Sequence, residues 1–269
     1  MLSIETKNLT KKFKEKTVVN GIELRINEGE LFALLGTNGA GKTTTIKMLS
    51  TLILPTDGEI KINGLDIIKD RQKIKEIINV SPQETAIAPN LSVKENLEFM
   101  AGVYQIPNKE EKINELVKMF KLEEVLNQKA KTLSGGWQRK VSIAISLIND
   151  PKILFLDEPT AGLDFESKKI FMSSLKSLNK NFKLTIIQSS HILEDIIEYG
   201  DTVLILNKNK KFINGNPRDL LFSKETLNNY GLKEPEIYKY IEELKKFGVK
   251  NIDNIKTNSE LIKKLFYSN

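Results

Sequence analysis

Two short stretches of the chain are wholly apolar and a third is apolar at Leu184, Ile186 and Ile187, and each is bounded by turn-forming or charged residues. They are Leu31–Leu35, which ends at Gly36, Ile153–Leu156, which follows Pro151, and Leu184–Ser190, which precedes a histidine. Continuous apolar runs of this length are typical of strands buried on both faces of a parallel sheet. The pattern therefore predicts an α/β fold with a mainly parallel central sheet.

Longer stretches repeat apolar side chains at helical spacing, and several carry start or stop signals. Ser92 with Glu95 and Thr257 with Glu260 have the spacing of capping boxes. A proline before residue 236 and a glycine after residue 247 flank one such stretch, as expected at the two ends of a helix. We expect helices over 43–49, 93–104, 109–120, 141–148 and 236–247, and a further helix that begins after Thr257 and continues through Leu265.

A glycine-rich segment follows the first apolar run and has the spacing GxxxxGK[ST]. In such a loop the glycines let backbone N–H groups turn toward phosphate oxygens, and the next helix presents its positive dipole end. Lys42 would reach the β- and γ-phosphates, and the Thr43 hydroxyl would bind Mg²⁺. The predicted loop consists of Gly36, Thr37, Asn38, Gly39, Ala40, Gly41, Lys42, Thr43 and Thr44.

Two carboxylates end the second apolar run, at the edge where open α/β sheets bind their ligands. We expect Asp157 to hold Mg²⁺ and Glu158 to orient and polarise the attacking water. These acids could instead cap a helix or turn a loop. Together with the glycine-rich loop these acids indicate a protein of the P-loop nucleoside triphosphatase class, but they do not distinguish among kinases, GTPases, helicases and ATPases.

Composition limits the cross-links, metal sites, partners and location that we expect for this chain. The chain has 269 residues, no cysteine and a net charge of +6, so disulfides and thiolate metal sites are excluded. Its lysines are spread along the sequence, which argues against a nucleic-acid patch. We found no apolar stretch long enough to cross a bilayer and no signal-like N-terminus, and we expect a protein at the cytoplasmic face of the membrane.

The segment LSGGWQ, Leu133–Gln138, lies between the loop and the two carboxylates. This order of motifs resembles the ATP-binding cassette (ABC) ATPases that power membrane transporters. The resemblance implies that Ser134, Gly135 and Gly136 open a helix whose amino end caps the γ-phosphate of ATP held by a second cassette. Ser134 is also a suitable N-cap residue, and the two glycines allow close approach of the backbone.

Smaller matches to the family add further site residues. The resemblance implies that Gln83 contacts Mg²⁺ and senses the γ-phosphate, that Asp164 lies at the interface of two cassettes, and that His191 contacts the γ-phosphate. Phe13 would stack on adenine, where the family more often has tyrosine, or it could be an ordinary apolar residue of an edge strand. Trp137 replaces the usual glutamine and Lys140 stands where arginine is common, and we expect these departures to alter packing more than chemistry.

The resemblance also suggests a division of the chain. We expect an ATPase domain over 1–215 with a small antiparallel part near its N-terminus, an inserted helical subdomain over 84–149, and a helical extension over 216–269. Ile87, Pro89 and Leu91, in the stretch 84–91, are candidates for a groove that receives the membrane subunit, or for ordinary loop packing.

We therefore predict an ATP- and Mg²⁺-dependent ATPase that pairs with a second cassette, identical or different, and drives a separate integral membrane subunit. The 78–104 region and the LSGGW variant favour exporters of drugs, antibiotics or polysaccharides. The C-terminal tail resembles that of the ATPases of energy-coupling-factor vitamin importers, so an importer of a vitamin or a metal is an alternative. Non-transport relatives that act on ribosomes or nucleic acid are an alternative, although they usually carry two cassettes or a long coiled-coil insertion.

Overall fold

The computed structural model describes residues 1–84, 86–208 and 211–267. A six-stranded sheet with the order β10-β9-β3-β8-β7-β6 forms its centre. All neighbouring strands in this sheet are parallel except β10, which pairs antiparallel with β9 at one edge. The strands are β3 (Leu31–Gly36), β6 (Ile78–Ser81), β7 (Ile153–Leu156), β8 (Thr185–Ser190), β9 (Thr202–Leu206) and β10 (Phe212–Gly215).

The three apolar runs form the middle of this sheet. Every residue of β3, β7 and β8 is buried, which explains why they lack the alternation of a half-exposed strand. Because β8 lies between β3 and β7, the segments that follow these strands meet at one edge. This edge carries the glycine-rich loop, the two carboxylates and His191.

A second, antiparallel sheet has the order β2-β1-β4-β5. It consists of β1 (Leu2–Phe13), β2 (Lys16–Asn27), β4 (Asp57–Ile62) and β5 (Leu65–Asp66). An apolar cluster joins it to the central sheet and to helix α1 (Lys42–Leu49), which contributes Ile46, Met48 and Leu49. Helix α2 (Arg71–Ile77) adds Ile74 to the same cluster.

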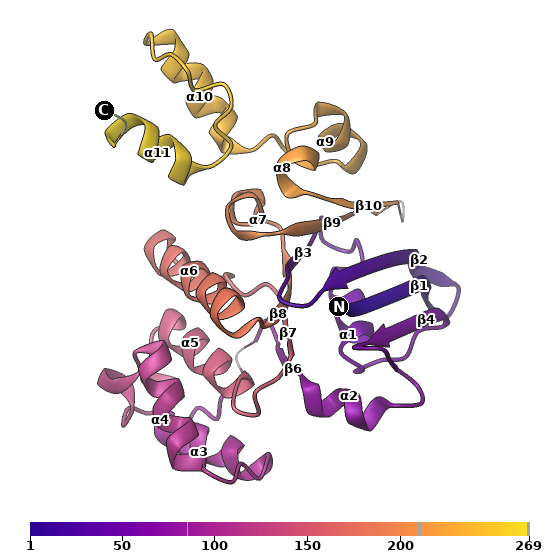
Figure 1. Ribbon diagram of the computed structural model, residues 1–269, viewed down its shortest axis with the longest axis vertical. Helices are drawn as coiled ribbons and strands as arrows, with labels where there is room; N and C mark the ends of the chain where they lie inside the picture. Colours follow the sequence, from indigo (N-terminus) through magenta and orange to yellow (C-terminus); the bar gives the residue numbers. More distant parts are fainter. Residues whose placement is uncertain (85, 209–210, 268–269) are drawn as a thin grey trace.

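The other face of the central sheet is covered by helices (Figure 1). Helices α5 (Gly135–Ser146) and α6 (Phe165–Phe182) share an apolar cluster with the strands, and α3 (Val93–Val103) and α4 (Lys109–Phe120) extend that cluster outward. Two short 3-10 turns, Glu123–Val125 and Ala130–Thr132, connect α4 to the segment before α5. The parallel sheet, the helical layer and the N-terminal antiparallel part confirm the predicted fold class.

Helix α7 (Leu193–Tyr199) follows β8, and the chain ends in α8 (Pro217–Leu220), α9 (Lys224–Tyr230), α10 (Glu236–Lys246) and α11 (Asn258–Phe266). Figure 1 shows α10 and α11 side by side, away from the sheet. Ile237, Ile241, Ile252 and Leu261 form a small buried cluster of their own. The two predicted capping boxes are present at Ser92 and Thr257.

Two side chains of the predicted apolar stripe lie outside the buried cluster, Tyr240, which is 45% exposed, and Phe247. Phe247 caps the C-terminal end of α10 and is 86% exposed, because it lies outside the cluster of side chains that α10 buries. Among the described residues, no helix is both long enough and apolar enough to cross a membrane. The proposed domain boundaries stay a prediction.

Candidate active site

The glycine-rich loop connects the end of β3 to the start of α1. Gly41 has φ 104°, a left-handed conformation that other residues rarely adopt. At Gly36 a Cβ atom would come within 2.5 Å of the Leu206 carbonyl oxygen. Both glycines are therefore required by the path of the backbone. Lys42 Nζ donates to the Gly36 carbonyl oxygen at 2.8 Å, so the lysine side chain lies across the loop it belongs to.

A cavity of about 500 Å³ lies over this loop. It brings together most of the predicted loop with Gln83, Glu158 and His191, which lie far apart in the sequence. Gln83 is exposed and follows β6. The lining residues are Val18, Thr37, Asn38, Gly39, Gly41, Lys42, Thr43, Thr44, Gln83, Glu158, Ala161 and His191.

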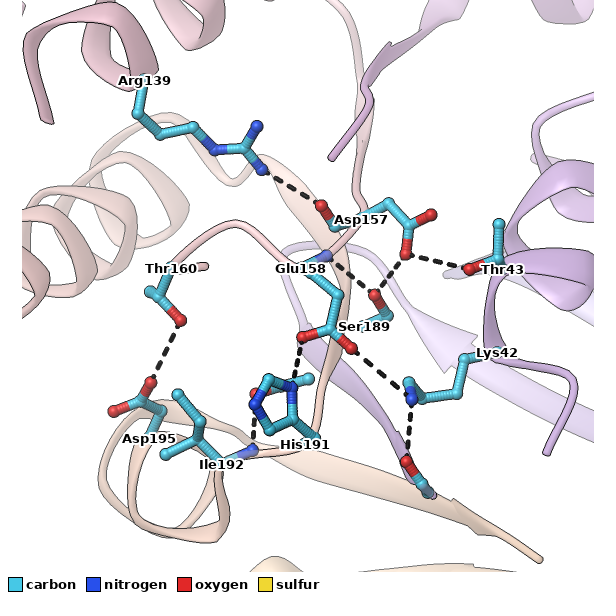
Figure 2. A network of polar contacts seen from close by, with 12 residues as sticks. Lys42, Thr43, Arg139, Asp157, Glu158, Thr160, Ser189, His191, Ile192 and Asp195 are labelled. Atoms are coloured by element: carbon cyan, nitrogen blue, oxygen red, sulfur yellow. Dashed lines mark hydrogen bonds and ion pairs between the residues drawn. The ribbon is translucent and has the colours of Figure 1, made fainter. Parts of the chain in front are cut away.

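Asp157 and Glu158 follow β7 and are held by Ser189, which no sequence motif had identified. Ser189 on β8 donates its hydroxyl to Asp157 Oδ1 at 2.5 Å and accepts from the Glu158 backbone N–H at 2.8 Å. Thr43 Oγ1 donates to the same Asp157 oxygen at 3.4 Å (Figure 2). The only signal for Ser189 was the polar end of an otherwise apolar strand.

Glu158 occupies the centre of the site. Its carboxylate lies 3.5 Å from Lys42 Nζ and 2.8 Å from His191 Nδ1 (Figure 2). The Glu158 side chain is 13% exposed, whereas the imidazole of His191 is 60% exposed. Glu158 also has φ 47°, a conformation that is strained for a residue with a side chain. Strain of this kind persists only where surrounding contacts fix the backbone, as it does at many functional sites.

The LSGGW segment lies elsewhere in the same chain. Ser134 is the N-cap of α5, as expected, but its side chain makes no capping hydrogen bond with any residue that the structure describes. Ser134 and Gly136 line a separate cavity of about 170 Å³ with Leu163 of the loop between β7 and α6. Neither is among the residues that line the cavity over the glycine-rich loop.

The two residues that depart from the family pattern contact each other. The Lys140 ammonium lies 4.3 Å from the centre of the Trp137 ring, within the range of a cation–π interaction. Trp137 is half-buried and packs against the apolar cluster of α5 and α6. Burial and the charge of Lys121 lower the pKa of Lys140.

Two predicted site residues, Asp164 and Phe13, lie outside the cavity over the glycine-rich loop. Asp164 caps α6 by accepting from the Ser167 backbone N–H at 2.9 Å, and this bond lowers the pKa of its carboxyl. Phe13 is at the end of β1, which is an inner strand of its sheet, and 49% of the residue is exposed. Neither residue lines the cavity over the glycine-rich loop, and their roles stay predictions.

Arg139 is another residue that the sequence did not single out. Its guanidinium is buried and donates to backbone carbonyls in the loops that follow β6 and β7. Figure 2 shows the bond to the Asp157 carbonyl. Asp195 on α7 is buried beside Thr160, at 3.4 Å, and Lys168, at 3.1 Å. Burial raises the pKa of Asp195, and the nearby Lys168 charge opposes that rise.

Comparison with known proteins gives one family. A family model described as ABC transporter matches residues 19–161, a range that contains the glycine-rich loop, LSGGW and both carboxylates. The linearmycin resistance ATP-binding protein of Bacillus subtilis is 36% identical over 219 residues, covering 81% of this chain and 70% of the relative. The spermidine/putrescine import ATP-binding protein of Haemophilus ducreyi is 30% identical over 264 residues, covering 96% of this chain and 69% of the relative.

A solved structure agrees with the sequence relatives. CbiO1 from Clostridium perfringens, part of an ABC transporter complex, aligns with a TM-score of 0.78 at 28% identity, over 90% of this chain and 99% of that one. The predicted family and reaction type are thereby confirmed. The chain belongs to the family of ABC transporter ATP-binding proteins, and it is an ATPase.

Proposed function

We propose that this chain is the ATP-hydrolysing subunit of an exporter and acts at the cytoplasmic face of a membrane, on a separate membrane subunit. The observation that most supports ATP hydrolysis is the position of Glu158, which faces the cavity over the glycine-rich loop between Lys42 and His191. A carboxylate there can accept a proton from water that attacks a phosphate bound in the loop.

The residues around Glu158 have distinct proposed roles. In the described structure Lys42 is paired with Glu158 and with the Gly36 carbonyl oxygen. Phosphate oxygens of bound ATP would give the ammonium a stronger partner, which leaves Glu158 available to orient water. His191 would keep the carboxylate in place through Nδ1 and present its other ring nitrogen to the γ-phosphate. Phe13 would stack on the adenine.

The donor set next to the loop fits Mg²⁺. The Thr43 hydroxyl and the Asp157 carboxylate are hard oxygen donors that lie 3.4 Å apart. Mg²⁺ commonly binds one or two protein oxygens together with substrate phosphates. Gln83, which lines the same cavity, would add a third protein oxygen. When bound, Mg²⁺ supplies positive charge that offsets the charge developing on the phosphates. In the part of the chain that the structure describes, no group of three acidic, histidine or cysteine side chains could hold a metal.

A second cassette, identical or different, would complete the site. Ser134 and Gly135 are exposed at the amino end of α5, and this end lies outside the cavity over the chain's own loop. Positive helix ends bind phosphate, so Ser134, Gly135 and Gly136 would cap ATP held by the other cassette. Asp164, exposed at the N-cap of α6, would lie at the same interface.

Export is favoured by similarity to the linearmycin resistance protein and to the Nod factor export ATP-binding protein of Ralstonia nicotianae, which is 33% identical over 223 residues. Import is the second candidate, because the polyamine import relative covers more of this chain, including the C-terminal extension. Residues 84–91 would meet the membrane subunit in either case. Residue 85 lies outside the described residues, while Ile87 packs on the apolar cluster of the helical layer.

Substitution of the central carboxylate tests the proposal. Glu158→Gln keeps the size of the side chain but removes the base, so we expect turnover to fall by a factor of about 10² to 10⁴ while ATP binding persists and a dimer accumulates. Glu59→Gln, at an exposed position on β4, is the matched control and should hydrolyse ATP normally. Near-normal hydrolysis by Glu158→Gln would reject Glu158 as the base. Isolation of the trapped dimer from native membranes would identify the membrane subunit and thereby the direction of transport.

A further inference from the structure

Arg139 holds four backbone carbonyl groups with one buried guanidinium. Nε donates to the Pro159 oxygen at 2.9 Å, and Nη2 donates to the Asp157 oxygen at 3.1 Å. Nη1 donates to the oxygens of Pro82 at 2.7 Å and of Gln83 at 3.3 Å. Only 3% of the residue is exposed. The guanidinium therefore connects two loops that follow neighbouring strands, β6 and β7.

This arrangement is unusual for a buried charge. Removal of a cation from water is costly and is normally compensated by a carboxylate partner, whereas the hydrogen bonds of Arg139 go to neutral carbonyls. Burial lowers its pKa to about 10, and the negative charge of nearby Asp157 opposes that fall, so the side chain stays protonated at neutral pH. A planar fork with several donors can hold four carbonyls at fixed angles, which a lysine ammonium cannot do.

The three segments that meet at Arg139 each carry a part of the proposed ATPase machinery. The first loop contains Gln83, and the second contains Asp157 and Glu158. Arg139 itself lies in the first turns of α5, the helix whose amino end is Ser134. A buried hydrogen bond of 3.1 Å between Ser142 on α5 and Ser81 on β6 joins the same face of the helix to the same strand end.

We propose that Arg139 is a positioning residue that fixes the signature helix α5 to the Gln83 loop and to the loop that carries the two carboxylates. The inference rests on the proposed function of those residues. Movement of the Gln83 loop on ATP binding is then transmitted to the amino end of α5, and Ser134 reaches the second cassette only when the first site is filled. A rigid link is needed because displacements of about 1 Å can lower a rate by about 100-fold.

Arg139→Met in the full chain keeps much of the length of the side chain and removes all four hydrogen bonds. We expect kcat to fall at least about tenfold, because the LSGG segment and the two carboxylates are no longer held in a fixed relative position. The KM for ATP and the ATP affinity of the monomer should stay within about twofold, because Arg139 does not line the cavity. Arg139→Lys should give an intermediate kcat. Arg71→Met is the matched control, because Arg71 also bonds a backbone carbonyl, of Thr51 at 2.7 Å, and lies outside the site; its kcat should equal that of the wild type.

Hydrogen–deuterium exchange separates positioning from general stability. ATP should slow exchange in both 82–84 and 133–138 in the wild type and in Arg71→Met, but only in 82–84 in Arg139→Met. An unchanged kcat in Arg139→Met, or slowed exchange in both segments, overturns the inference. So does a parallel loss of kcat, ATP affinity and thermal stability in both Arg139 variants. Absence of hydrolysis in the wild type refutes the proposed function instead, and the exchange pattern then decides the inference by itself.

Discussion

The nucleotide edge of the central sheet and the C-terminal helix pair are organised in different ways. At the sheet edge, buried polar side chains bond one another and nearby backbone groups: Ser189 on β8 donates to the Asp157 carboxylate and accepts from the Glu158 backbone N–H, and Arg139 on α5 donates to backbone carbonyls. In the helix pair, four buried apolar side chains, Ile237, Ile241, Ile252 and Leu261, hold α10 and α11 together. The first arrangement fixes positions at the cost of buried polarity, and the second mainly provides stability. Substitutions at the sheet edge should therefore affect ATP binding and hydrolysis more than stability, and substitutions in the helix pair should do the reverse.

The largest expected effect on stability lies in the helix pair. Ile252 is fully buried at the centre of its cluster, so Ile252→Ala should lower the free energy of unfolding of this extension by about 2 to 5 kcal/mol. ATP hydrolysis should remain normal, because the cluster lies apart from the nucleotide cavity. Limited proteolysis of the C-terminal residues measures the first effect, and Phe247→Ala, at an 86% exposed position, is the control. A loss of turnover in Ile252→Ala would show that the two regions are coupled.

At the sheet edge, Lys42→Ala should affect binding instead of folding. Loss of a charge-assisted phosphate contact of about 1.5 to 3 kcal/mol should weaken ATP by roughly ten- to a hundredfold. The melting temperature without nucleotide should change less than the ATP affinity, because Glu158, the ion-pair partner that Lys42 leaves behind, lines the cavity and keeps its contact with His191. Nucleotide titration measures the affinity. An unchanged value would contradict the assignment of the loop.

The smallest expected effect concerns Gln188, one of the four polar residues of β8. It is 1% exposed, and neither its amide nitrogen nor its amide oxygen has a hydrogen-bond partner among the described residues. Gln188→Met should therefore raise the free energy of unfolding by about 1 to 3 kcal/mol, since it removes a buried unsatisfied group and keeps the volume. Chemical denaturation measures the change. Destabilisation would mean that the amide has a structural role, and an accompanying loss of turnover would place Gln188 with Ser189 among the positioning residues.

Local patterns accounted for some of the individual elements, although α6 was not among the expected helices. The apolar runs became β3, β7 and β8, and the capping boxes at Ser92 and Thr257 began α3 and α11. The stripe of α10 was less well predicted, since Phe247 has the right spacing but lies outside the buried cluster. Spacing determines which face a side chain shares, whereas burial depends on what packs against that face.

The residues of the candidate site also fall into two groups, those recognised from local motifs and those recognised only from contacts in the folded chain. GxxxxGK[ST], the two acids and LSGGW were found from the sequence because their chemistry depends on residues close together in the chain. Ser189, Val18 and Arg139 were not found, because their hydrogen bonds and contacts join segments that are far apart in sequence. The bond from Ser189 to Asp157 spans 32 residues, and that from Thr43 to Asp157 spans 114.

Residue order alone was therefore sufficient for the family, the reaction and the type of fold, because phosphate binding and strand formation depend on local spacing and polarity. The groups that act on those residues became known only from the folded chain. It placed Glu158 between Lys42 and His191, brought Ser189 to the acids, and buried the Arg139 guanidinium among four carbonyls. These contacts arise from the order in which the strands lie in the sheet, and that order brings distant segments to a common edge.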